Sequence, residues 1–396
     1  RDPKLDIYVN TYSSLEVTQS NITSGWFILK DQNDQTDFDY INLKGEMTKN
    51  VLQYVSINKQ LKGKAKKIIY QSSRYCHQQV NENGTVTLLS NQKAYHIISD
   101  KEYKTFNAAN LSIFKEYEDQ FYSFPGAGIA DIGYDGSYNL YTINTNKIYS
   151  IYGMSSNVGK YGLEKLIGTS SDYSLHGEMV TNDGNAMVFD NKSKSFLYTS
   201  GAGTSLNYFN DKVGSVSLKN MKSNLIALLT RTNPLAASVF AIVENLNTTT
   251  DTGKYSLLSI SFNYTSTSVY PVTQIDTIPN KYQMPTAKVL SAPLVSSCIY
   301  FSNDNKLNVY ITAGDNRESV LKTFPSDETI SCIKNINGKM NGETVNTNYL
   351  AVTTNSSKGW KLYLFKIIGV TAEIDPEPVH VIEGEGNARY IMYRAS

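Results

Sequence analysis

The chain has 396 residues, of which 40% are hydrophobic and 18% are charged, and its formal net charge is +1. This even charge balance gives no reason to expect DNA, RNA or an acidic membrane surface as a partner. No run of about 18 apolar residues occurs, so the sequence predicts no transmembrane segment. Asn, Ser, Thr and 29 Tyr residues make up much of the rest. This mixture favours strands and turns over helices.

Short apolar or alternating runs, bounded by Gly, Asn, Asp and Ser, recur along the whole chain and predict β-strands. The strands fall into groups of about four. In chain order, the groups cover residues 26–57, 68–106, 130–167, 177–209, 225–275, 297–324 and 329–382, and a last strand lies at 388–394. Residues 51–57 are expected to form a strand of the first group. A short helical turn is expected only between residues 108 and 125.

The last strand is predicted to join the first group, because a propeller closes its ring in this way and leaves no open sheet edge. The sequence therefore predicts an all-β propeller with seven four-stranded blades, with six or eight blades as alternatives. No linker rich in Pro, Gly or Ser divides the chain, so residues 1–396 are expected to form one domain. Long insertions at 106–128, 245–254 and 338–348 predict loops on one face, which is often the binding face of a repeat protein.

Several short motifs occur in a characteristic order. They are SGWFILK at 24–30, KIIYQ at 67–71, TINTNKIY at 142–149, VFDNKSKSF at 188–196, IYF at 299–301 leading to KLNVY at 306–310, ETI at 328–330 and LAVTT at 350–354. In this order, and over nearly the whole chain, the sequence resembles the PKD-like family of lipoproteins from gut Bacteroidetes.

The resemblance implies an exported protein at the cell surface, on the outer membrane. The lipid anchor would belong to an N-terminal segment that is missing from this chain, together with Ig-like or PKD-like modules before the propeller. Members of the family are often encoded near glycan-uptake systems, which implies a glycan or a surface protein as partner. The family carries no agreed catalytic residues, so the resemblance assigns none here.

Three side chains are candidates for ligand binding. Trp360 follows a hairpin turn and is expected at a rim, whereas Trp26 is expected in the core. His176 immediately precedes an expected innermost strand, which places it beside the central channel; a structural or solvated histidine is the alternative. Tyr134 ends an expected strand, and a tyrosine ring can stack on a sugar while its hydroxyl stays at a wet edge. Strand filling is the alternative for any one tyrosine.

A weak calcium candidate lies in the first hairpin. Asp31, Asn33, Asp34 and Asp37 place oxygen atoms at positions 1, 3, 4 and 7, as in half of a calcium-binding loop. The glycine at position 6 is missing, and position 12 is Asn42 rather than Glu. A plain hairpin loop is the alternative. The sequence has no zinc pattern, and no other cofactor is predicted.

The sequence carries no signature of an enzyme. No Gly-x-Ser-x-Gly nucleophile elbow occurs. Glycoside hydrolysis would need two carboxylates that converge from different blades, and Asp131 with Glu178 is one candidate pair. We therefore expect a non-catalytic binding module that acts as a monomer. The alternatives are a structural or docking scaffold, and a propeller glycoside hydrolase or lyase.

Two further features have ordinary interpretations. Cys76, Cys298 and Cys332 are expected as free thiols, although a bridge between Cys298 and Cys332 is an alternative if their Cα atoms lie within about 7 Å. The run at 62–67 holds four lysines and is expected to be a solvated loop rather than a nucleic-acid patch.

Overall fold

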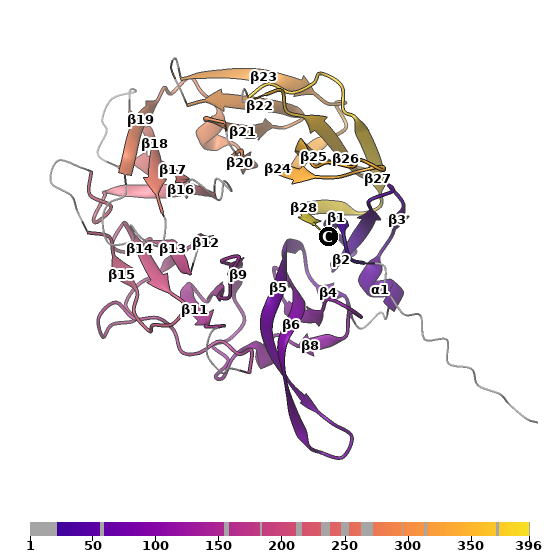
Figure 1. Cartoon of the computed structure of the whole chain (residues 1–396). Coiled ribbons are helices and arrows are strands. Elements are labelled where there is room, and N and C mark those ends of the chain that lie inside the picture. The colour runs from indigo at the N-terminus through magenta and orange to yellow at the C-terminus, as the bar shows by residue number, and fades with distance from the viewer. Residues whose placement is uncertain are drawn as a thin grey trace, which may run out of the picture.

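Seven antiparallel sheets stand around a central axis in the computed structural model of the chain (Figure 1). The structure describes residues 22–55, 59–153, 158–182, 184–210, 216–230, 238–246, 253–262, 272–294, 296–312, 314, 316–369 and 372–395. The arrangement is a seven-bladed β-propeller, which confirms the predicted fold class and the predicted number of blades.

Six blades follow one another along the chain, and each is built outward from its innermost strand. Their strands are β5 (Ala65–Val80), β6 (Val86–Ser99), β7 (Tyr103–Asn107) and β8 (Ile113–Lys115); β9 (Ile129–Tyr134), β10 (Leu140–Asn144) and β11 (Lys147–Ile151); β12 (Leu175–Asn182), β13 (Asn185–Asp190), β14 (Ser195–Ser200) and β15 (Asn207–Tyr208); β16 (Ser223–Thr230), β17 (Ser238–Asn245), β18 (Tyr255–Ser261) and β19 (Val272–Ile278); β20 (Leu290–Ser291), β21 (Cys298–Asn303), β22 (Lys306–Ile311) and β23 (Arg317–Thr323); and β24 (Thr329–Gly338), β25 (Thr347–Ser356), β26 (Gly359–Lys366) and β27 (His380–Gly384).

The closing blade joins the two ends of the chain. It consists of β28 (Asn387–Arg394), β1 (Gly25–Gln32), β2 (Gln35–Asn42) and β3 (Met47–Thr48), and β4 (Leu61–Lys62) also pairs with β2. Strand β28 is antiparallel to β1 and innermost, so the ring closes as the sequence predicted. Asn355 of the preceding blade holds Ala388 of β28 through two hydrogen bonds, from its Nδ2 to the Ala388 oxygen (3.0 Å) and from the Ala388 nitrogen to its Oδ1 (2.9 Å).

Among the described residues, the hydrophobic core is divided into eight clusters of buried side chains, and seven of them lie at the seven junctions between neighbouring blades. Strand β1 shows why the sequence is apolar on both faces of such strands. Phe27 and Leu29 pack toward the β5–β8 blade, whereas Trp26 and Ile28 pack toward the β24–β27 blade. A strand that is covered on both faces needs apolar residues at every position rather than at alternate ones.

Residues 51–55 form a helix, so the strand expected at 51–57 is wrong over its described part. Helix α1 (Val51–Val55) begins where the Asp37 carboxylate accepts hydrogen bonds from the backbone nitrogens of Leu52 (2.8 Å) and Gln53 (2.9 Å). A carboxylate at a helix N-terminus satisfies otherwise unpaired N–H groups. The cap comes from another element, which explains why the local sequence did not reveal it.

Three smaller features complete the fold. The helical turn expected between residues 108 and 125 is the 3₁₀ helix η2 (Glu118–Gln120), and a second one, η3 (Met284–Thr286), precedes β20. Residues 163–167, the end of the predicted group at 130–167, form only isolated bridges, so the β9–β11 blade has three strands rather than four in the described part of the chain. Cys76, Cys298 and Cys332 are free thiols, as expected.

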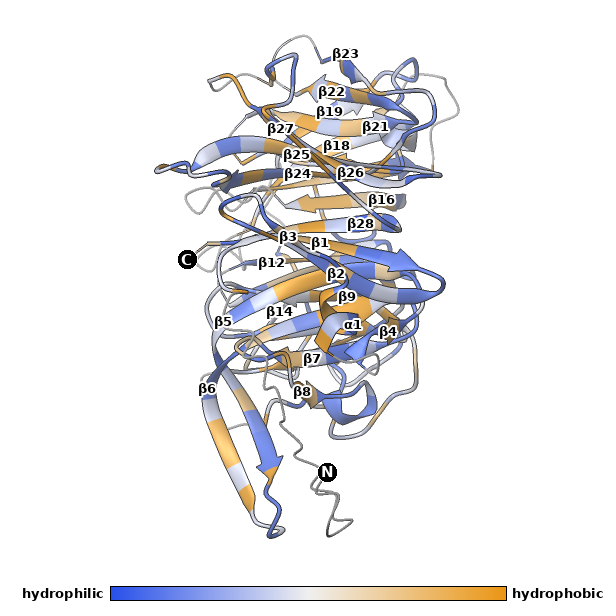
Figure 2. Cartoon of the chain, turned by 90° about the vertical axis from the view of Figure 1, so that its right-hand side faces the viewer, coloured by the Kyte–Doolittle hydropathy of each residue, from blue (hydrophilic) through white to orange (hydrophobic). Residues whose placement is uncertain are grey.

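Strands β5 and β6 extend beyond their blade as a two-stranded arm, which projects from the ring in both views (Figures 1 and 2). From Gln78 to Leu88, the two strands pair only with each other, and Val80 and Val86 are exposed near the tip. Strand β6 continues without a break through the polar run SNQK at 90–93. Among the described residues, none of the helices is long and apolar enough to cross a membrane.

Candidate functional site

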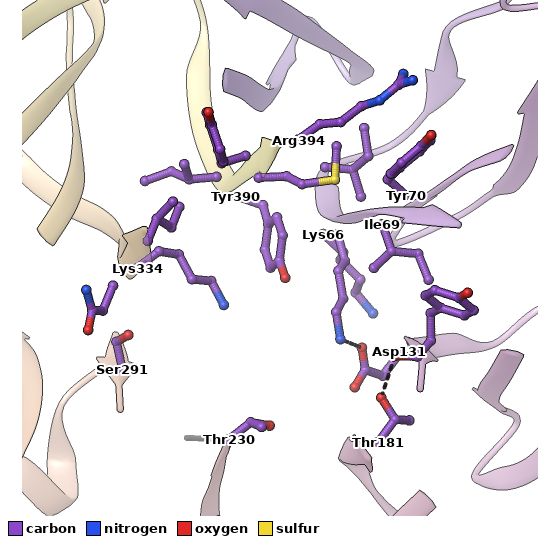
Figure 3. A pocket seen from close by; sticks show the side chains of 18 of the residues that line it. Lys66, Ile69, Tyr70, Asp131, Thr181, Thr230, Ser291, Lys334, Tyr390 and Arg394 are labelled. Atoms are coloured by element: carbon purple, nitrogen blue, oxygen red, sulfur yellow. Dashed lines mark hydrogen bonds and ion pairs between the residues drawn. The ribbon is translucent and has the colours of Figure 1, made fainter. Parts of the chain in front are cut away.

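A cavity of about 1730 Å³ lies on the axis of the propeller (Figure 3). Its wall includes residues from the innermost strand of all seven blades: β5, β9, β12, β16, β20, β24 and β28. Polar, charged and tyrosine side chains line it, together with aliphatic groups such as Ile69 and Leu228. Because every blade contributes, the closure of the ring defines the shape of this cavity.

Two carboxylates of the wall connect neighbouring blades. One oxygen of Asp131 in β9 accepts a hydrogen bond from the Lys67 ammonium of β5 (2.8 Å). The other oxygen accepts a hydrogen bond from the backbone nitrogen of Met179 in β12 (3.1 Å). Glu178 of β12 accepts the backbone nitrogen of Leu228 in β16 (2.9 Å). These contacts run across four consecutive blades. The structure therefore brings the two predicted carboxylates to the same part of the wall.

The two carboxylates have different electrostatic surroundings. Burial raises the pKa of Glu178 to about 7, against the opposing effects of the Leu228 hydrogen bond and of Lys67, and the charge of Asp131 adds to the rise. The Glu178 side chain lines the cavity and is 45% exposed, so solvent screens part of this effect. The pKa of Lys67 is raised, because its ion pair with Asp131 outweighs the effect of burial. Near neutral pH, Glu178 is therefore only partly ionised.

We expect the stability of the protein to fall as the pH rises through about 7, because the folded state holds the Glu178 proton more tightly than the unfolded state, whose pKa is near 4.5. This contribution is fully present below about pH 4.5 and absent well above pH 7. Urea unfolding of the wild type and of Glu178→Gln, from about pH 5 to about pH 8, measures it. Over this range, the free energy of unfolding of the wild type should fall by up to about 1 kcal/mol relative to the variant. The effect is small because the side chain is partly exposed. A difference that is constant with pH would contradict this assignment.

Three cationic side chains approach the cavity from β5, β24 and β28. Lys334 extends beside Tyr390, with its Nζ atom 4.6 Å from the centre of that ring (Figure 3). Tyr390 raises the pKa of Lys334, so this ammonium stays charged at neutral pH. The Arg394 guanidinium lies 4.1 Å from the centre of the Tyr70 ring, and Lys66 donates to the Ile129 oxygen (3.0 Å). The wall therefore presents fixed positive charges next to aromatic rings.

The three residues predicted to bind a ligand lie in different surroundings. Tyr134 lines the cavity, and its hydroxyl donates to the Ser137 oxygen (3.1 Å). His176 lies beside the lining residues Gly177 and Glu178, with its Nδ1 atom 3.9 Å from Glu178 Oε2, and burial lowers its pKa. Whether either residue binds a ligand stays a prediction.

The expectation that Trp360 lies at a rim is wrong, because its side chain is fully buried. Its indole nitrogen donates to Asp39 (3.1 Å) across the junction with the closing blade. The ring lies over Gly384 in the neighbouring strand, where an added Cβ would come within 2.4 Å of the indole. A glycine inside a strand is the signal that could have indicated this packing. Trp26 is fully buried, as expected.

Three of the four calcium candidates have separate partners. Asn33 and Asp34 form a two-residue turn between β1 and β2 with φ values of 52° and 60°, a conformation that favours Asn and Asp. Asp34 pairs with Lys101 (2.6 Å), Asp31 pairs with Arg389 (2.7 Å), and Asp37 caps α1. In the described ranges, no three His, Cys, Asp or Glu residues are grouped so as to hold a metal ion. The calcium site stays a prediction.

The lysine run at 62–67 is not the single solvated loop that the sequence predicted. Lys62 belongs to β4, whereas Lys66 and Lys67 belong to the innermost strand β5 and line the cavity. The sequence analysis missed these two residues, and also Lys334 and Arg394. No local signal marked the last two, since their place on the axis follows from the closure of the ring.

No family model matches the chain, and no curated protein matches its sequence. Among solved structures, it is similar to a candidate 6-phosphogluconolactonase from Bacteroides uniformis, with 12% identity and a TM-score of 0.49 over 94% of this chain and 99% of that one. It is also similar to the β-propeller domain of Cps50 (Swd1) from Myceliophteria thermophila, with 10% identity and a TM-score of 0.42 over 82% of this chain and 90% of that one. A third match is Hsv2 from Kluyveromyces lactis, with 9% identity and a TM-score of 0.42 over 91% of this chain and 99% of that one. At these identities, the likeness concerns the fold alone.

Proposed function

We propose that this propeller is a non-catalytic binding module that takes its ligand in the central cavity. The observation that carries the proposal is the cavity itself, whose volume of about 1730 Å³ exceeds the roughly 300–1,000 Å³ of common small-molecule sites. Tyrosine rings, hydroxyl groups and charged groups from separate blades converge on it. Such a mixture suits a polar ligand with several hydrogen-bonding groups.

The resemblance to surface lipoproteins of gut Bacteroidetes supports an exported protein on the outer membrane, in a glycan-uptake context. Between the two kinds of partner predicted, a glycan suits the concave cavity better than a folded protein does. A sugar chain can enter an axial cavity, whereas folded proteins meet mostly over broad surfaces of about 800 Å² per partner. A monomer is sufficient for this function, because all seven blades of one chain build the wall.

The catalytic alternative has weaker support. A two-carboxylate hydrolase needs one carboxylate that is free to attack a sugar or to activate a water molecule. One oxygen of Asp131 accepts hydrogen bonds from the Lys67 ammonium and the Ile132 nitrogen, and the other accepts one from the Met179 nitrogen. Because both of its oxygens accept hydrogen bonds, this carboxylate stabilises the junctions between blades and is not free to react. A scaffold function, in turn, would leave the lining of the cavity without a role.

We expect Gly177→Trp to abolish ligand binding, because the indole would occupy the cavity. A Cβ atom at Gly177 would meet only the Ala130 Cβ atom, at the ordinary contact distance of 3.7 Å, so the backbone tolerates the change. Retention on a broad glycan array, with calcium and with EDTA, identifies the ligand for the wild type. The affinity of the variant should fall by at least about a hundredfold, which corresponds to about 2.7 kcal/mol.

Gly162→Trp is the matched control. A Cβ atom at Gly162 meets nothing within 4 Å, and the residue is not part of the cavity wall. This variant should bind like the wild type, and both variants should unfold at the wild-type temperature. Equal binding by wild type and Gly177→Trp would show that the ligand binds elsewhere. A lack of binding to every glycan would favour the scaffold alternative. Loss of binding on calcium removal would support the predicted calcium site.

A further inference from the structure

The cavity holds more positive than negative charge, although the chain as a whole is nearly neutral. Five cationic side chains and two carboxylates belong to its wall. The cations are Lys66, Lys67, Lys93, Lys334 and Arg394, and the carboxylates are Asp131 and Glu178. A concave site that is lined mainly by one sign of charge focuses the electrostatic potential and attracts ligands of the opposite sign.

Among the described residues, most of these cations form no ion pair with a carboxylate. Lys67 is paired with Asp131. In the part of the chain that the structure describes, no carboxylate lies within ion-pair distance of the other four cations, which are Lys66, Lys93, Lys334 and Arg394. An ammonium or guanidinium group that lines a cavity without a counter-ion gains most from an anionic ligand, because a charge-assisted hydrogen bond is about twice as strong as a neutral one.

The placement of these groups suits a ligand that also carries hydroxyl groups. Lys334 and Lys66 extend into the cavity from separate blades, on either side of Tyr390 (Figure 3). The hydroxyl-bearing side chains of Thr181, Thr230 and Ser291 lie on other parts of the wall in the same view. The cations are thus spread along the wall, which suits charges that repeat along a chain better than one compact anion.

We propose that the ligand of the central cavity is an acidic oligosaccharide, whose carboxylate or sulfate groups pair with Lys334 and Lys66. This inference rests on the proposed function and adds the chemical class of the ligand. Carboxylate and sulfate share the chemistry that these lysines recognise, so separate probes must distinguish them. The volume of the cavity accommodates an oligomer rather than a single ring.

Calorimetric titration tests the inference with four probes of similar length: an oligogalacturonate, a sulfated heparin oligosaccharide, a neutral malto-oligosaccharide and an oligoglutamate. We expect one of the two acidic saccharides to bind, with an affinity that falls as salt is raised. The neutral saccharide should bind at least about tenfold more weakly, which corresponds to about 1.4 kcal/mol. Equal binding of the neutral saccharide would overturn the inference. Equal binding of oligoglutamate would overturn the saccharide class.

Charge-removing variants test whether the affinity depends on charges in the cavity or on the net charge of the whole protein. Lys334→Gln and Lys66→Gln should each weaken binding of the acidic saccharide by about tenfold. Lys49→Gln removes the same charge from an exposed pair with Glu385 and should leave the affinity unchanged. An equal loss in Lys49→Gln would overturn the inference. If instead a neutral glycan binds and Gly177→Trp abolishes its binding, the proposed function stands and only the acidic class fails.

Discussion

Replacing Asp39 with alanine is expected to lower the free energy of unfolding by about 3–5 kcal/mol. Asp39 and Lys30 are almost fully buried, and the Lys30 Nζ atom lies 2.8 Å from Asp39 Oδ2. The same carboxylate accepts the Asn50 nitrogen (2.7 Å) and the Trp360 indole nitrogen (3.1 Å). The substitution would leave a buried ammonium without its counter-ion and two donors without an acceptor, which is among the most costly changes in a core.

Urea unfolding measures this loss, and Asp34→Asn is the matched control, because asparagine removes the charge and keeps the positive φ of this turn position. Asp34 belongs to the same hairpin, but its pair with Lys101 is exposed, so its removal should cost no more than about 1 kcal/mol. In the double variant Lys30→Met/Asp39→Ala, the buried charge is gone, so part of the lost stability should return. Similar losses in Asp39→Ala and Asp34→Asn would contradict the view that this buried ion pair stabilises the closing blade.

Deletion of residues 387–396 is expected to abolish cooperative folding. Strand β28 pairs with β1 along the axis, and Ala388 and Ile391 belong to the buried cluster that joins the closing blade to the β24–β27 blade. Without β28, the edge of β1 and the apolar residues Trp26 and Ile28 would lose their cover. Exposed strand edges next to apolar surface favour aggregation. Soluble yield and the sharpness of the thermal transition measure the effect.

Removal of the β5–β6 arm is the control, because it deletes a similar length of chain outside the ring. Residues 78–88 pair only with one another, so their replacement by an Asn-Gly turn should leave the melting temperature of the ring within a few degrees of the wild type. If the deletion of β28 still folds cooperatively while the arm deletion does not, the ring does not depend on closure by the C-terminal strand.

The blades could be predicted from sequence because the strands and turns of each blade have recognisable patterns in their own residues. An apolar strand such as β1 is covered on both faces, and turns such as Asn33–Asp34 mark the hairpins. The exceptions are elements that depend on distant partners. Helix α1 depends on the Asp37 carboxylate at its N-terminus. Trp360 is buried because its indole nitrogen donates to Asp39 and its ring packs over Gly384. Neither dependence is visible in the residues around the element itself.

The candidate site was harder to predict, because its residues meet only when the ring closes. Lys66 and Lys334 lie on strands from different blades, far apart in sequence, yet both line the cavity. The net charge of +1 hid this arrangement, because it averages the wall of the cavity with the whole surface. Tyr134 was found because it ends an innermost strand. Asp131 and Glu178 were found as a pair, but their contacts with backbone nitrogens of other blades could not be foreseen.

The most direct test of binding in the cavity is amine acetylation of the protein with and without its glycan ligand, read by peptide mass spectrometry. The modification of each lysine reports how far ligand covers it. Binding on the axis predicts strong protection of Lys66 and Lys334, and unchanged labelling of the exposed Lys49. Unchanged labelling of Lys66 and Lys334 at saturating ligand, with protection confined to lysines outside the cavity, would contradict binding in the cavity.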